Sequence, residues 1–74
     1  MIRELDSVVL TADLPEHRLR AGDVGTVVSL HGDRGYEVEF VALDGETLAV
    51  VSLDASRVRP IGSGEMAHAR QVGS

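Results

Sequence analysis

Short runs of alternating apolar and polar residues, separated by turn residues, cover most of this 74-residue chain. The run from Tyr36 to Phe40 alternates without a break, which is typical of an antiparallel strand with one buried and one solvated face. Similar runs elsewhere, and the lack of an amphipathic helical pattern of ten residues, predict an all-β protein. The expected strands are residues 7–11, 24–30, 36–40, 47–53 and 58–61.

The segments between these strands carry turn signals of different kinds. Residues 12–21 contain Pro15 and are too long for a tight turn, so we expect an excursion loop there. Residues 31–35 and the pair Asp44-Gly45 predict two hairpins, because their glycines supply the positive φ that such turns need. Residues 54–57 are too few for an α-helix and are expected to form a single 3₁₀ turn.

Gly25 is the most informative residue of the second expected strand. A glycine inside a strand marks a bulge, a sharp bend or a close approach of the backbone to another group. Alternation places Val24, Thr26, Val28 and Leu30 on the inward face of this strand. Val27 is then expected on the opposite, outward face.

Five strands, a long first loop, a bend glycine and a one-turn helix before the last strand describe an SH3-like barrel over residues 1–61. The segments Leu14-Pro15, Gly22 to Val28 and Tyr36 to Phe40 are similar to those of the small bacterial family known as domain of unknown function 4926. This resemblance covers residues 5–61. It implies a fold and no biochemistry.

Composition bounds the partners and the compartment. With 12 acidic residues, 7 arginines and no lysine, the net charge is −5, and there is one Tyr, one Phe and no Cys. Nucleic-acid binding needs clustered cations or several stacking rings, so the composition disfavours it. The chain shows neither a signal-peptide layout nor an apolar run near the ~20 residues of a membrane span, which predicts a cytoplasmic protein. Residues 62–74 lack any apolar period and are expected to be a mobile tail, or in part a remnant of cloning.

Candidate chemistry is sparse. His17, His31 and His68 lie in separate expected loops, and their spacing does not aim two imidazoles at one ion, so we expect no metal and no cofactor. Nothing resembles a nucleophile elbow, and a barrel of this size encloses little volume. The sequence therefore predicts that the protein is not an enzyme.

The fourth expected strand is apolar on both faces. Either a strongly coiled strand buries both faces near its corners, or part of this surface binds a protein partner or a second copy. Val27 and Val41, out of phase with the inward residues of their strands, would join the outward group. The candidate partner-binding residues are Val27, Val41, Leu48, Val50, Val51 and Leu53, rimmed by Glu37, Glu39, Arg57 and Arg59.

We therefore expect a non-catalytic protein-interaction module, docking or self-associating through apolar strand surface. One alternative is an acidic antitoxin, in which carboxylates take the places of phosphates in a basic, nucleic-acid-processing toxin. A second alternative arises because Gly22 to Val28 resembles the glycine-centred KOW segments of ribosomal and transcription proteins, which implies RNA or ribosome binding. The cations nearest to Gly25 in the sequence are Arg18, Arg20 and Arg34. Acidic residues lie among them, which disfavours the continuous positive surface that RNA binding needs. The carboxylates of the antitoxin alternative are Glu37, Glu39, Asp44 and Glu46.

Overall fold

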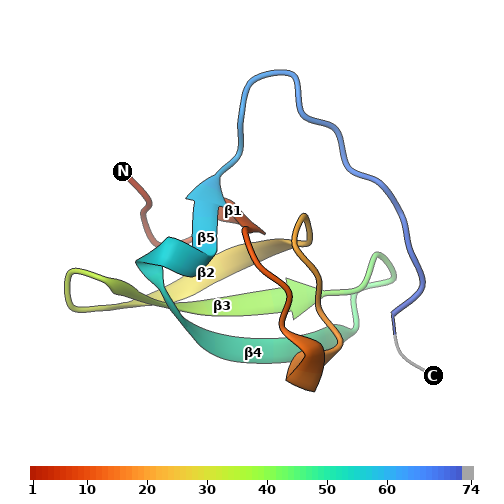
Figure 1. Cartoon of the computed structure of the whole chain (residues 1–74), viewed down its shortest axis with the longest axis horizontal. Coiled ribbons are helices and arrows are strands. Elements are labelled where there is room, and N and C mark those ends of the chain that lie inside the picture. Colours follow the sequence, from red (N-terminus) through yellow and green to blue (C-terminus); the bar gives the residue numbers. More distant parts are fainter. Residues whose placement is uncertain (73–74) are drawn as a thin grey trace.

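Five antiparallel strands form one strongly curved sheet in the order β4-β3-β2-β1-β5 (Figure 1). The computed structural model describes residues 1–72. The strands are β1 (Ser7–Leu10), β2 (Val24–His31), β3 (Gly35–Val41), β4 (Thr47–Asp54) and β5 (Val58–Pro60), with 3₁₀ helices η1 (Pro15–His17) and η2 (Ala55–Arg57).

The all-β prediction with five strands is confirmed, and every strand ends within one residue of its expected limit. In the described part of the chain, β4 pairs only with β3 and β5 pairs only with β1, so hydrogen bonds do not close the sheet into a barrel. That the fold is an SH3-like barrel stays a prediction.

The core lies on the inner face of the sheet and takes residues from every strand. Its members are Val8, Leu10, Leu14, Leu19, Val27, Val38, Phe40, Val51, Leu53 and Val58. Leu14 and Leu19 come from the loop between β1 and β2, where their backbones exchange two hydrogen bonds, of 2.9 and 3.1 Å. This loop reaches from the end of β1 to the level of β4, with η1 at its tip (Figure 1). The expected excursion loop therefore contributes to the core.

The alternation expected for β2 is wrong, because a β-bulge changes its phase. Val27 pairs with Val38 and Ser29 pairs with Glu37, so Val28 has no partner in the register. Val27 is fully buried, whereas Val24 and Leu30 are each 47% exposed. A bulge inserts one extra residue into one strand, so the inward positions before and after it no longer follow a single alternation.

Position 25 requires glycine because its backbone approaches buried side chains closely, one of the three explanations that the sequence left open. It pairs with Val8 of β1. A Cβ atom at this position would lie 2.6 Å from Cγ1 of Val38 and 2.8 Å from Cε1 of Phe40. Both of those side chains are almost completely buried. The bulge of the strand is at Val28 instead.

Both hairpins and the 3₁₀ turn form where the turn residues predict them. In the β3–β4 hairpin, Gly45 has a φ of +97° and donates its N–H to the carbonyl of Ala42 at 2.8 Å. Asp54 caps η2, since its carboxylate accepts a 2.9 Å hydrogen bond from the backbone N–H of Ser56. Side-chain caps of this kind satisfy an N–H that has no partner within the helix. No helix in residues 1–72 is long and apolar enough to cross a membrane.

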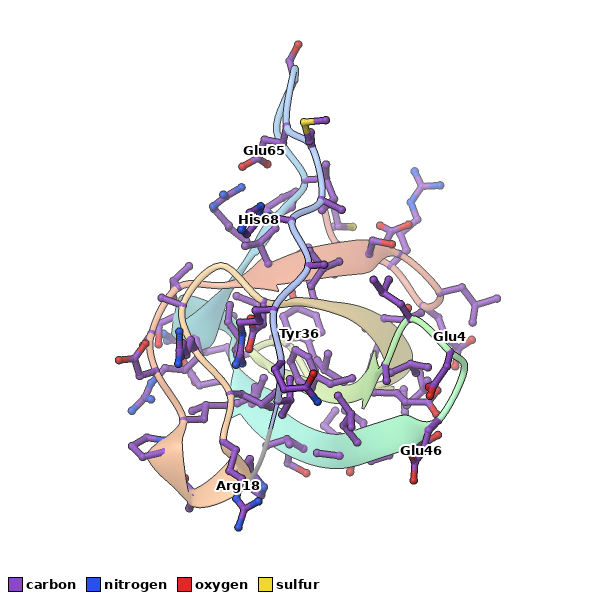
Figure 2. The ribbon with its side chains drawn as sticks, turned by 90° about the vertical axis from the view of Figure 1, so that its right-hand side faces the viewer. Glu4, Arg18, Tyr36, Glu46, Glu65 and His68 are labelled. Atoms are coloured by element: carbon purple, nitrogen blue, oxygen red, sulfur yellow. The ribbon has the colours of Figure 1, made fainter. Side chains whose placement is uncertain are left out.

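Residues 62–72 leave β5, arch away from the body and return to the side of the β1–β2 loop (Figures 1 and 2). They form no helix or strand. Glu65 and Arg70, the two charged residues of this segment, each make an ion pair with the body, Glu65 with Arg59 and Arg70 with Asp23. That the tail is mobile stays a prediction, and its last two residues, 73 and 74, lie outside the described residues.

Candidate partner-binding face

The structure separates the apolar residues of β4 into a buried and an exposed set. Val51 and Leu53 belong to the core, with 8% and 7% of their surface exposed. Leu48 and Val50 are 40% and 51% exposed. The tertiary structure therefore resolves the two-sided pattern of this strand, and only Leu48 and Val50 remain candidates for contact with a partner.

Val27 is buried and Val41 is exposed, although both were expected on the outward face. Val27 is fully buried by the bulge in β2, so its expected outward position is wrong. Val41, at the end of β3, is 43% exposed as expected. Val27, Val51 and Leu53 are therefore no longer candidates for binding a partner, because a core side chain cannot touch a partner in the folded protein.

The remaining candidates of β3 and β4 are neighbours in the sheet, and we call them the β3–β4 patch: Glu37, Glu39, Val41, Leu48 and Val50. Val50 lies directly opposite Glu39 in the register, and Val41 lies opposite Thr47. Opposite residues of an antiparallel pair project on the same face of the sheet. Leu48 occupies the irregularity between these two pairs. Three exposed apolar side chains thus adjoin two carboxylates.

Hydrogen bonds hold both carboxylates of the patch in place. Glu37 Oε1 accepts from the hydroxyl of Ser52 at 2.9 Å and lies 2.8 Å from Nε2 of His31. Glu39 Oε2 accepts from the hydroxyl of Thr47 at 2.8 Å. The hydrogen bonds from Ser52 and then from His31 lower the pKa of Glu37, so this carboxylate is charged at neutral pH.

Of the two arginines predicted to border the binding surface, Arg57 and Arg59, the second is bound to a carboxylate of the tail. Arg57 ends η2 and is exposed. Arg59 lies on β5, at the opposite edge of the sheet from β4. Its guanidinium donates two hydrogen bonds to Glu65, of 2.9 and 2.6 Å. The charge of Arg59 is therefore already paired within the chain.

The three histidines lie in different elements, His17 in η1, His31 at the end of β2 and His68 in the tail. Within residues 1–72, no three His, Cys, Asp or Glu side chains gather closely enough to hold a metal ion. An open hollow of about 490 Å³ lies between the η1 loop and the tail, where Arg70 and Gln71 line it.

One site has no signal in the sequence, a carboxylate that binds the tail. Asp23 Oδ1 accepts from Nε of Arg70 at 2.9 Å, and Oδ2 accepts from Nη2 of the same side chain. Burial alone would raise the pKa of Asp23, but hydrogen bonds from Arg70 and from the backbone of Arg20 outweigh it and lower the pKa. Asp23 and Arg70 are 47 residues apart, and no sequence pattern pairs them.

Comparison with known proteins places the chain in a family. The family described as "Domain of unknown function (DUF4926)" matches residues 4–60. The chain belongs to the DUF4926 family. No curated protein and no solved structure matches it.

The range matched by the DUF4926 family includes the body of the protein and excludes the tail. The β3–β4 patch lies entirely inside the matched range, and so do Asp23 and Arg59. Their partners in the tail, Arg70 for Asp23 and Glu65 for Arg59, lie beyond it. The DUF4926 region therefore provides both body-side partners of the tail.

Proposed function

We propose that this DUF4926 protein is a non-catalytic interaction module that binds a basic protein on its β3–β4 patch. The observation that carries the proposal is the exposure of Val41, Leu48 and Val50 beside two fixed carboxylates. Exposed apolar side chains grouped on a small domain are typical of a binding surface. The neighbouring charges would orient the partner and speed its approach.

The charge of this region supports a basic partner over a second copy of the chain. Glu37 and Glu39 lie within the patch, and Asp44 and Glu46 form the adjoining hairpin. Two copies meeting through this surface would bring like charges together, which is unfavourable where solvent is excluded. A basic surface with an apolar centre would satisfy both parts of the patch.

A basic, nucleic-acid-processing toxin is one partner with this chemistry, and carboxylates of the patch would then stand where phosphates bind. RNA binding through the Gly25 region has less support. Gly25 is buried against Val38 and Phe40, so the packing of the core accounts for this glycine without a ligand.

The test is capture of the partner from the native host with the full chain and matched variants. Val50→Asp removes the exposed apolar centre, and Glu37→Gln with Glu39→Gln removes the charge. Leu5→Ser is the control, because Leu5 is 75% exposed and lies outside the patch. We expect a basic protein to be retained by the wild type and the control and lost from both patch variants.

Two results would contradict the proposal. In one, every variant retains the same proteins, so binding does not use the patch. In the other, light scattering shows a wild-type dimer that Val50→Asp converts to a monomer, which would make the patch a self-association surface. Thermal unfolding of each variant shows whether the fold is intact.

A further inference from the structure

A site that binds an arginine lies at the start of β2. A contact within the body orients the Asp23 carboxylate, because Oδ2 accepts a 2.8 Å hydrogen bond from the backbone N–H of Arg20. The carbonyl of Arg18 stands beside it and accepts a 3.2 Å hydrogen bond from Nη2 of Arg70. A carboxylate that binds two guanidinium nitrogens and a nearby carbonyl form a directional site that suits arginine better than lysine.

A second receptor, for a carboxylate, lies on β5. Arg59 binds both oxygens of Glu65 with its two terminal nitrogens. The sheet register connects the two receptors, because Arg59 pairs with Val9 of β1, and Val9 pairs with Val24 of β2, the residue after Asp23. Arg59 therefore lies at one end of a row that crosses three strands, and Asp23 directly precedes Val24 at the other end. We call this row the cross-strand site: Arg59, Val9, Val24 and Asp23, with the carbonyl of Arg18.

Ion pairs join the tail to the two ends of this site, and Val9, in the middle of the row, is 5% exposed. Five residue steps from Glu65 to Arg70 can reach about 17 Å, whereas three strands span about 10 Å. The tail turns at residues 62–65, where the N–H of Glu65 donates to the carbonyl of Gly62, and it then descends past His68 (Figure 2). Met66 and His68, between the two anchors, are exposed. Val24, which ends the row beside Asp23, is 47% exposed.

We propose that the cross-strand site binds an extended peptide segment of another protein, one that carries a carboxylate and, about five residues later, an arginine. The chain's own residues 62–72 occupy this site in the absence of that partner. The receptor groups lie within the DUF4926 match, and the occupying segment lies outside it. A partner segment that runs straight between the two charged groups would also cover Val24, which is 47% exposed beside the tail.

The tail then acts as a tethered competitor. A short flexible connection holds a segment at an effective concentration of about a millimolar, so an external peptide must displace it. The Arg59–Glu65 pair is exposed, and an exposed ion pair strengthens attachment by a factor of about 1.4 to 5. The Arg70–Asp23 pair is partly buried, and we take the same range as its lower limit. Removal of both pairs is therefore expected to strengthen binding of an external peptide about 2-fold to 30-fold.

The experiment uses the full chain and a synthetic peptide with the sequence of residues 62–72, followed by shifts of backbone amide NMR signals. Glu65→Gln with Arg70→Gln keeps the length of the tail and frees both receptors. We expect the peptide to shift the signals of Asp23, Val24 and Arg59 at lower concentration in this double variant than in the wild type. A variant pair at Glu4 and Arg57, both to Gln, is the control and should behave like the wild type.

Changes to the peptide keep the test independent of protein folding. A peptide with Arg replaced by Gln, and one with Glu and Arg placed next to each other, should bind more weakly than the native sequence. In the freed chain, Asp23→Asn should also remove binding. Equal binding of all three peptides, or equal affinity of the wild type and the freed chain, would overturn the proposal. So would shifts confined to the β3–β4 patch.

Discussion

Replacement of Gly25 by alanine would insert a methyl group against two buried side chains of the core. The new Cβ would lie 2.6 Å from Cγ1 of Val38, and 2.8 and 3.0 Å from two ring carbons of Phe40. Ordinary contacts between carbon atoms are about 3.5–4.0 Å. Val38 is fully buried and Phe40 is 2% exposed, so neither side chain can move aside without disturbing its own neighbours.

The expected loss of stability follows from two opposing contributions. Inserting a methyl group into a well-packed core costs about 1–3 kcal/mol. Alanine also restricts the unfolded chain more than glycine does, which offsets about 0.4–1 kcal/mol. Because two buried side chains are approached at once, we expect a net loss of about 1–2.5 kcal/mol. For a domain of this size, that loss lowers the melting temperature by about 5–20 °C.

Urea unfolding followed by far-ultraviolet circular dichroism measures the free energy of unfolding directly. The matched control is Gly25→Ala in a Val38→Ala background, where the closest contacting atom is absent. The penalty of the glycine substitution should be smaller there, by about 0.5–2 kcal/mol, since contacting residues couple in a double-mutant cycle. An equal penalty in both backgrounds, or a wild-type midpoint for Gly25→Ala alone, would refute the packing explanation for this glycine.

Three further predictions follow from burial and from the pKa shifts. Val27→Ala should destabilise the fold by about 2 kcal/mol, because it leaves a cavity at a buried site. Val41→Ala, at an exposed site, should change stability by less than about 0.5 kcal/mol. Equal effects of the two substitutions in urea unfolding would contradict the burial of Val27 that the bulge in β2 produces. The hydrogen bonds to Glu65 lower its pKa from 4.5 to about 2, so its contribution to tail attachment is complete above pH 4.5 and is lost as the pH falls toward 2. NMR signals of residues 62–72 should change over that interval, and a transition centred at 4.5 would show that the ion pair is absent. Ser52→Ala should raise the pKa of Glu37 toward its usual value, because the Ser52 hydroxyl is the main cause of its lowering; a carboxyl NMR titration identical to the wild type would contradict this.

Local patterns in the sequence determined the number of strands, their limits and their turns. Alternation, turn glycines and the length of a connecting segment act over a few residues, so their consequences can be read without the partner strands. Tyr36 to Phe40 and Asp44-Gly45 predicted β3 and the hairpin that follows it. Alternation within Tyr36 to Phe40 also puts the carboxylates Glu37 and Glu39 on the same face of this strand.

Tertiary structure decided which apolar surface is exposed and which charges meet. In β4 both faces are apolar, so only packing against the rest of the core distinguishes Val51 from Val50. In β2 the bulge at Val28 depends on the register with β3, and it buries Val27 against the local alternation. The pairing of Asp23 with Arg70 depends on the path of a segment 47 residues further along the chain. Each of these features requires contact between residues distant in sequence, and periodicity within one segment carries no information about such contacts.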